Sequence, residues 1–419
     1  MGNSIKVASI IAKEALAIVD NNLSGVIDSF YRGHEDEFTK KVNGYDIGDT
    51  VTIRRPADFV PRTSITLSAQ DIVEGSTTLQ INKVAGVDFT LSSSEMNLTM
   101  EDRAGVNSLR DRVIRPAAIN IVNTVVADCM TALYQGTYNW VGTPGTRITT
   151  FAGFSKGPER LDEMAVPFAD RFAVLSPNDN WGLVGAQTAM YVQEAAKSAY
   201  RAGSLGELGG VETYMSQVTP THTVGPLGGT PRVNGASQNV TYATAKDSWS
   251  QSLITDGWTA AAASRVKAGD VFTIANVYMV NPKTKLSTGI LQQFVVTADG
   301  SSDGSGNLTL TISPPMITSG PHQTVNAASA DDALLTMLGT ANTAYKQNLV
   351  YHKNAFALAV VPMVIPPGSI GHARETFKNL SIKIGPVYNG TDNSSSWRMD
   401  MLYGRALIDP RLSTRLSGT

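Results

Sequence analysis

Residues 108–134 read SLRDRVIRPAAINIVNTVVADCMTALY and carry the longest helical pattern in the chain. Ser108 and Asp111 are spaced like a capping box, in which a hydroxyl and an acidic side chain serve the free N–H groups of a first turn. From Ile114 to Leu133 the apolar residues recur at about 100° per residue. The pattern therefore predicts a helix over residues 108–135 that is about 40 Å long, buries half of its surface and ends at Gly136.

Two further expectations concern the same helix. Pro116 lies inside the pattern, which predicts a kink near residues 112–116. The side opposite the apolar residues carries polar ones: Asn120, Asn123, Thr124, Asp128, Thr131 and Gln135. On periodicity alone, this is the central helix of a core.

Length and composition bound the class of protein. A chain of 419 residues exceeds one compact core, so two or three domains are expected. Charged residues make up 17% of the chain, which is low for a soluble protein and indicates that much of the surface meets other protein. A formal net charge of -2 argues against a protein whose main task is to grip nucleic acid.

Cysteine, histidine and hydropathy exclude several classes. Cys129 is the single cysteine and lies on the apolar side of the long helix, so an inert buried thiol is expected and a disulfide framework is not. The five histidines are scattered, which argues against a zinc site. The start of the chain lacks the pattern of a signal peptide, and no run reaches the ~18 apolar residues of a membrane span. A soluble protein of a reducing compartment is expected.

The segments before the long helix differ in character. Residues 4–31 have helical spacing and are followed by a charged bridge at 32–41 that suggests an extension packing elsewhere. From Gly48 the period changes to two, with a first strand broken by Pro56 and Pro61. The runs TTLQINKV and GVDFTLS then predict a hairpin around residues 85–86. Residues 48–92 are thus a long β excursion between helical elements.

After the long helix the pattern is mixed. Residues 137–155 are expected to be loop-like, 158–164 to start a helix, 171–179 to form a buried strand with a turn, and 180–203 to be helical. The glycine-rich stretch 204–220 lacks both dinucleotide and P-loop spacing and is interpreted as turns. Short strands at regular spacing over about 232–317 predict a small β barrel or sandwich. A helix at 331–338, further strands and an exposed polar loop at 389–396 follow.

Three motifs could carry chemistry, and each has a simpler interpretation. Residues 300–304 match G-x-S-x-G, but a strand follows Ser302 where a hydrolase needs a helix, so a hairpin tip is favoured. The loop 299–310 resembles a calcium loop but ends on Leu310, which cannot supply the closing carboxylate. Arg54 and Arg55 are interpreted as a solvated or interface-facing pair and not as a phosphate site. We therefore predict no catalytic, cofactor-binding or metal-binding residues, and no enzyme.

The order of elements and several strings resemble a known family. SRVKAGDVFTIANVYMV with LQQFVVTADG and NLTLTISPPM, in the β segment, are similar to the insertion domain of the major capsid (coat) proteins of short-tailed double-stranded DNA phages of the Salmonella P22 type. NLVYHKNAFALAVVPMVIP and WRMDMLYGRALIDPRL resemble the strands that resume after that domain, and GVDFTLSSSEM the end of the family's extended loop. The resemblance spans essentially the whole chain, and residues 225–264 are a longer lead-in than the family pattern.

The resemblance implies an α+β fold of the tailed-phage and herpesvirus type, also called HK97-like, with an inserted telokin-like β barrel. The implied domains are an N-terminal helical arm (1–47), an extended β loop (48–92), a peripheral domain (93–155) with a spine helix (108–135), a first part of the axial domain (156–228), the inserted barrel (229–320), and the rest of the axial domain with peripheral strands (321–419). The polar side of the spine helix would then face a shell surface.

The implied function is that of a major capsid protein. Hexamers and pentamers of it would assemble into an icosahedral shell with a scaffolding protein and a portal, in the host bacterial cytoplasm, and enclose double-stranded DNA in the virion without sequence-specific binding, cofactor or membrane. The extended loop would lie over a neighbouring subunit, and the candidate subunit contacts are Lys40, Lys41, Arg54, Arg55 and Phe59. The alternatives are another virion component, such as a tail or adhesin protein with a ligand-binding β insert, and a hydrolase that uses Ser302.

Overall fold

The computed structural model describes residues 26–35, 38, 50–60, 62, 65–67, 69–92, 113–187, 205–261, 263–365, 367, 372–377, 380–391 and 394–419. The chain forms two compact units. Unit 1 comprises Met1–Thr52, Thr78–Cys129 and Phe356–Ala406, and unit 2 comprises Ile53–Thr77, Met130–Ala355 and Leu407–Thr419. The expected mixture of helices and strands is therefore spread over units that are each discontinuous in sequence.

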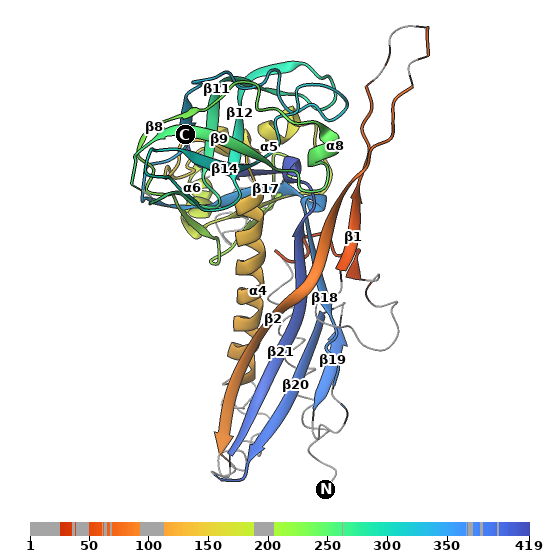
Figure 1. Ribbon diagram of the computed structural model, residues 1–419. Coiled ribbons are helices and arrows are strands. Elements are labelled where there is room, and N and C mark those ends of the chain that lie inside the picture. Colours follow the sequence, from red (N-terminus) through yellow and green to blue (C-terminus); the bar gives the residue numbers. More distant parts are fainter. Residues whose placement is uncertain are drawn as a thin grey trace. The chain divides into compact units, whose positions relative to one another are not determined.

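Unit 1 is built on a long sheet (Figure 1). Its strand order is β1 (Thr50–Arg55), β2 (Gly75–Ser92), β21 (Ser394–Leu407), β20 (Leu380–Asn389) and β19 (Ala373–Phe377), and β18 (Phe356–Val361) also pairs with β21. β2 and β20 both run antiparallel to β21. The expected polar loop at 389–396 is shorter than predicted, because Asn389 already pairs with Ser394 in the sheet.

The predicted hairpin at residues 85–86 is wrong. Ala85 and Gly86 lie inside β2, where they pair with Met401 and Asp400 of β21. A side chain at Gly86 would place its Cβ 2.6 Å from an Asp400 carboxylate oxygen, so glycine permits close approach of the two strands. The alternation of buried and exposed residues continues through this point, which is the signature of one continuous strand.

The long helix is α4, Arg115–Gly136, and its predicted apolar side is confirmed. Ala118, Ile121, Val125, Cys129 and Leu133 are all at most 1% exposed. Pro116 lies in the first turn of α4, where its missing N–H is not needed, and residues 113–114 form a π-helical turn before it. The irregularity is therefore at the start of α4 and not a kink within it. Ser108 and Asp111 lie outside the described residues.

The polar side of α4 differs in part from expectation. Asn120, Asn123 and Thr124 are exposed, but Asp128 is bonded to Lys83 of β2 and to Arg405 of β21. Asp128 therefore holds the helix on the sheet of unit 1 and does not face outward. Among the described helices, α4 is also long and apolar enough to cross a membrane, contrary to expectation. Its burial and its bonds to the sheet are those of a core helix.

The end of the N-terminal segment packs on β18. Tyr31 bridges Ala357 in parallel, and its N–H donates to the carbonyl of Phe356 at 3.0 Å. Glu35 is 2% exposed and accepts from the backbone N–H of Val360 at 3.1 Å. The expected charged tether is thus, over residues 32–35, a docked part of unit 1, because the buried Glu35 has a backbone partner.

Unit 2 contains a sheet of order β3 (Trp140–Val141), β22 (Ser413–Leu416), β17 (Asn348–His352), β4 (Arg171–Leu175), β6 (Val211–Met215) and β5 (Glu207–Leu208). The predicted buried strand at 171–175 is confirmed as β4. α5 (Phe151–Glu163) begins earlier than predicted, because Thr150 caps it by accepting from the N–H of Gly153. α6 (Pro177–Gln187) begins the next predicted helix, whose remainder lies outside the described residues. β5 and β6 replace the expected turns.

A second sheet of unit 2 has the order β15 (Leu335–Met337), β11 (Val271–Val280), β12 (Ser287–Val296), β14 (Leu308–Ser313), β9 (Gln251–Trp258) and β8 (Gly229–Val233). Its two end strands meet, since Val233 donates to Ala333 and Asp332 donates to Val233. The sheet therefore closes around a core that includes Phe272 and Phe294. The helix predicted at 331–338 is wrong, because Leu335 pairs with Ile274 in this sheet.

Buried polar groups join the two sheets of unit 2. Arg415 of β22 is fully buried and donates to the carbonyls of Thr137 at 2.9 Å and Gly269 at 2.7 Å. Burial lowers the pKa of Arg415 to about 9. Nearby, the buried Asp270 is 2.8 Å from Nε2 of His222. The Arg415 contact fixes the segment before β11 against the C-terminal strand, and the Asp270 contact fixes it against β7 (Thr221–Thr223).

Candidate subunit-contact surface

Residues 56–74, here called the arm, connect β1 to β2, and the described residues among them stand out from the rest of unit 2 (Figure 1). β1 ends at Arg55 because Pro56 has no N–H for the sheet. Five apolar arm residues are exposed: Phe59 (52%), Val60 (38%), Ile65 (101%), Leu67 (81%) and Ile72 (70%). Exposed apolar residues gathered on one segment mark a surface that binds another molecule.

The two sides of the arm are held together by a side-chain amide. The Gln70 amide accepts from the N–H of Val60 at 3.0 Å and donates to its carbonyl at 2.6 Å. The Gln70 amide thereby makes with the Val60 backbone the two hydrogen bonds that a paired strand would make. Because the bonds fix the arm before any partner binds, they lower the entropy lost on binding.

Arg55 anchors the first end of the arm. Its guanidinium donates to the carbonyl of Ile408 at 2.9 Å and of Lys246 at 3.3 Å, and lies 5.5 Å from the ring centre of Trp249. Only 7% of the residue is exposed, and this burial lowers its pKa. The expectation of a solvated or interface-facing pair is therefore wrong for Arg55. Arg54 is exposed, with a 3.5 Å ion pair to Glu74.

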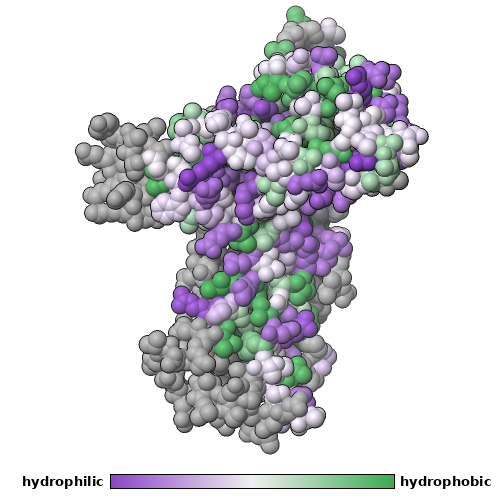
Figure 2. Space-filling model, turned by 90° about the vertical axis from the view of Figure 1, so that its left-hand side faces the viewer, coloured by the Kyte–Doolittle hydropathy of each residue, from purple (hydrophilic) through white to green (hydrophobic). Residues whose placement is uncertain are grey.

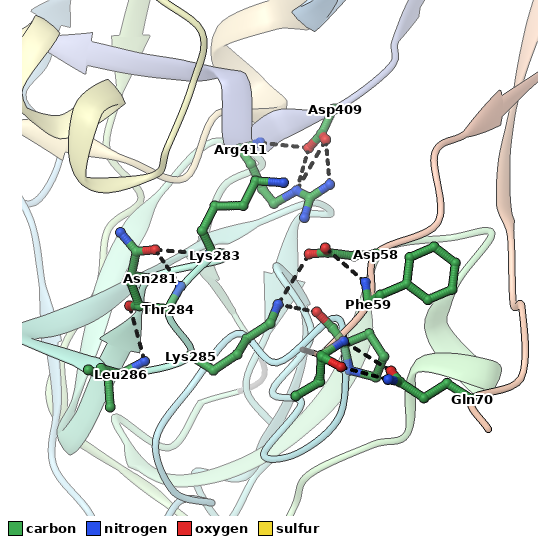
Figure 3. A network of polar contacts seen from close by, with 12 residues as sticks. Asp58, Phe59, Gln70, Asn281, Lys283, Thr284, Lys285, Leu286, Asp409 and Arg411 are labelled. Atoms are coloured by element: carbon green, nitrogen blue, oxygen red, sulfur yellow. Dashed lines mark hydrogen bonds and ion pairs between the residues drawn. The ribbon is translucent and has the colours of Figure 1, made fainter. Parts of the chain in front are cut away.

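An ion pair fixes the arm three residues further on (Figure 3). Lys285, in the turn between β11 and β12, lies 3.2 Å from Asp58 and also donates to the carbonyl of Pro321. Burial alone would raise the pKa of Asp58, but the hydrogen bond and charge of Lys285 outweigh it and hold this pKa below its usual range. Asp58 is therefore ionised at neutral pH and bound to the closed sheet.

The second end of the arm is anchored at Ser76. Its N–H and its hydroxyl both donate to Asp247, at 3.0 and 2.8 Å. A Cβ at Gly75 would lie 2.5 Å from the carbonyl oxygen of Lys246, so the chain needs glycine for this approach. Both ends of the arm are thus bonded to the segment that contains β8 to β15.

The candidate contact residues have different outcomes. Phe59 and Arg54 are exposed, Arg55 is buried within unit 2, and Lys40 and Lys41 lie outside the described residues. Sequence reasoning missed Gln70, Lys285 and Asp247. Lys285 and Asp247 gave no local signal, because they lie 227 and 171 residues from their partners. Gln70 lies only 10 residues from Val60. The face drawn in Figure 2 has hydrophobic residues scattered among hydrophilic ones.

In the two loop motifs considered for chemistry, the polar side chains of Ser302 and Asp303 are engaged in hydrogen bonds within the fold. Ser302 is 2% exposed, and its hydroxyl donates to the carbonyl of Thr259 and accepts from Arg265. The carboxylate of Asp303 accepts from the N–H groups of Ser305 and Asn307, as in a tight turn. Among the described residues, no group of three metal-ligating side chains is gathered.

Comparisons with known proteins place these features in context. A family model described as "P22 coat protein - gene protein 5" matches residues 17–418. The "Major capsid protein" of Acyrthosiphon pisum secondary endosymbiont phage 1 is 23% identical over 389 residues, which cover 88% of this chain and 89% of that protein.

Solved structures are also similar in part. A structure titled "Mycobacterium phage Che8" covers 93% of this chain and 89% of that chain, with 12% identity and a TM-score of 0.46. A structure titled "CUS-3 coat protein I-domain" is 30% identical, covers 26% of this chain and 96% of that chain, and has a TM-score of 0.19.

Proposed function

The chain belongs to the P22 coat protein family, and from this premise we propose that the arm binds a neighbouring copy of the same chain in the shell. The protein is the major capsid protein of a tailed phage, a structural component of the icosahedral capsid with the HK97-like fold.

One observation carries the proposal for the arm. The apolar residues along the arm are exposed, whereas at its base Arg55, Asp58 and Ser76 are each bonded to the rest of unit 2. A segment that is firmly held at both ends and apolar along its length is suited to bury itself on a partner. In a shell made of one chain, that partner is a second copy.

The proposed domains follow the family. We assign residues 1–47 to the family's N-terminal helical arm, which is distinct from the arm at residues 56–74. We assign residues 93–155 to a peripheral domain around α4, and the sheet that contains β22 to the axial domain. The inserted barrel begins near Gly229 and, in our assignment, extends to Met337, because β15 pairs with β11 and meets β8. This moves its end beyond residue 320, the boundary expected from the sequence.

The proposed partners during assembly are a scaffolding protein and a portal, in the cytoplasm of the host bacterium. The shell would enclose double-stranded DNA without gripping it, which fits a chain of net charge -2. We also propose that the chain has no catalytic role. The contacts of Ser302 inside its turn support this, because in the described part of the chain its hydroxyl is bonded to a backbone carbonyl and to Arg265 and to no general base.

Replacing residues 57–73 by a short Gly-Ser turn tests the proposal. β1 and β2 must be kept, since β2 is paired with β21 from Ile81 to Ser92 in the unit 1 sheet. The variant, expressed with the scaffolding protein, should give a folded protein with normal circular dichroism and no closed particles by electron microscopy. Particles of normal number and stability would contradict the role of the arm.

A further inference from the structure

A cavity of about 370 Å³ lies in unit 2 where the arm begins. Its apolar wall includes Pro56, Met164, Pro167, Pro282 and Leu412. Pockets that bind small ligands measure about 300–1,000 Å³. The cavity therefore has room for one or two aliphatic side chains.

The two carboxylates that line the cavity are already paired. Asp58 lies 3.2 Å from Lys285, and Asp409 lies 2.7 Å from Arg411. Asp409 also accepts from Nε of Arg411 at 3.0 Å, so this pair is bidentate (Figure 3). Each carboxylate therefore already has one cation in direct contact.

One exposed cation of the same lining, Lys283, is available to a partner, whereas Arg55 is buried. Arg55 is bonded to two backbone carbonyls, and Lys283 is exposed at the turn before β12. In the part of the chain that the structure describes, neither lies within ion-pair distance of an acidic side chain. An occupant with aliphatic side chains and a nearby carboxylate would match this lining in both respects.

The arm has that composition. Its aliphatic residues Ile65, Leu67 and Ile72 are more than two-thirds exposed, and Asp71 beside them is exposed as well. None of these three aliphatic residues lines the cavity of its own chain. With roughly nine residues in each direction, it can carry its tip at most about 30 Å from its base.

We propose that the cavity is the receptor for the arm of a neighbouring copy, with aliphatic side chains inside and Asp71 facing Lys283. This rests on the proposed function of the arm and names the surface that it binds. Each copy then has one arm and one receptor, at the same corner of unit 2. Such a head-to-tail contact forms rings when the rotation between copies closes, as in capsomers.

Cysteine cross-linking in assembled particles tests the proposal. Ala57→Cys in the cavity lining is combined with Ile65→Cys, Leu67→Cys or Ile72→Cys in the arm. Cys129 is fully buried, and burial raises the pKa of its thiol, so it contributes little background. Particles of each variant are oxidised, or treated with a short bismaleimide, and run on a denaturing gel without reductant.

The expected result is a ladder of covalent oligomers that ends at the size of the ring, for at least one arm position. Ala57→Cys paired with Ile254→Cys, which is 50% exposed on β9, is the control and should stay monomeric. Cross-links confined within single chains, or intact particles with no cross-links at all three positions, would overturn the proposal. If a double variant does not assemble, mixtures of the two single-cysteine chains should give dimers that neither chain gives alone.

A charge exchange gives an independent measurement. Lys283→Glu should lower the initial rate of assembly about tenfold, and Asp71→Lys in the same chain should restore most of it. Equal rates for Lys283→Glu and the wild type would contradict the facing of these charges. Failure of wild-type chains to form particles would instead count against the proposed function of the arm.

Discussion

Arg405 of β21 and Asp128 of α4 form a bidentate ion pair, with Nε 2.6 Å from Oδ2 and Nη2 3.0 Å from Oδ1. Lys83 of β2 and Tyr403 of β21 each donate to the same carboxylate at 3.0 Å. Burial alone would raise the pKa of Asp128, but its bonds to Arg405 and Lys83 outweigh this and hold the pKa below its usual range. One carboxylate thus ties α4 to two adjacent strands.

Asp128→Ala should therefore destabilise unit 1. Breaking a buried ion pair costs about 3–5 kcal/mol, and because the Asp128 side chain is 24% exposed, we expect about 1–3 kcal/mol in urea unfolding at neutral pH. Because its pKa is lowered on folding, this stability is present above pH 3.8 and is lost as the pH falls below that value. Asn123→Ala, at an exposed site of the same helix, should cost at most about 0.5 kcal/mol; equal losses would contradict the role of Asp128.

The period of α4 was sufficient to predict its buried side, because apolar spacing is a local property of the sequence. The partner of Asp128 was not predictable in this way. Asp128 binds Arg405, which lies 277 residues away along the chain, so no local pattern of the sequence indicates this pair. Asp128 was therefore wrongly expected to face outward, because β21 supplies Arg405 as its partner.

His322 makes the stability of unit 2 depend on pH. It is 6% exposed, and its ring stacks on Tyr242 with the centres 3.7 Å apart. Burial, and then the charge of Arg411, lower its pKa to about 4 from 6.5. The neutral ring is thus favoured by folding, and stability falls as the pH decreases from 6.5 towards 4.

A loss of about 1–3 kcal/mol is expected from His322 between pH 7.5 and 4.5. His322→Gln should remove this part of the pH dependence, while the part due to other groups, such as His352, remains. Urea unfolding of both proteins at the two pH values provides the measurement. Identical pH dependence in wild type and variant would show that His322 titrates normally in the folded protein.

Gly404 of β21 is a position of close backbone approach. A Cβ there would lie 2.4 Å from the carbonyl oxygen of Gln80 and 2.9 Å from its carbon, both in β2. Gly404→Ala must separate the two strands and should cost about 1–3 kcal/mol in unfolding free energy. Gly390→Ala is the control, because its nearest neighbour would be a Tyr388 ring atom at 3.6 Å. A cost no larger than that of the control would refute the close approach.

The continuous strand β2 was only partly predictable: Leu79, Ile81 and Ala85 occupy inward positions, but Lys83 lies between them and the apolar Val84 is exposed. The dipeptide Ala85-Gly86 suggested a turn, but the glycine serves the approach of Asp400. Residues 48–92 were predicted as a β excursion that needs a partner. The exposed apolar residues of the arm support this for residues 56–74, whereas β2 pairs with β21 of the same unit. Its anchors were not predictable, because contacts over hundreds of residues depend on how the whole chain folds.

Gln70→Glu should impair assembly while leaving the subunit folded. The substitution keeps the size of the side chain but removes the N–H₂ group that donates to Val60, and it sets a carboxylate against that carbonyl. Loss of a hydrogen bond of about 1 kcal/mol would lower the population of arms whose two sides are joined by the bonds between Gln70 and Val60 roughly fivefold. The effect multiplies over the copies of a ring. We expect at least a tenfold slower appearance of particles in light scattering, with an unchanged unfolding midpoint.

Gln80→Glu provides the matched control for this prediction. It introduces the same charge at an exposed site of β2, where the side chain accepts from Asn82 and a carboxylate can still accept. Its assembly rate should stay within about twofold of wild type, because no donor is lost. If both variants slow assembly equally, net charge is the cause and not the bonds between Gln70 and Val60. If Gln70→Glu assembles normally, the arm does not need to be fixed before a neighbour binds it.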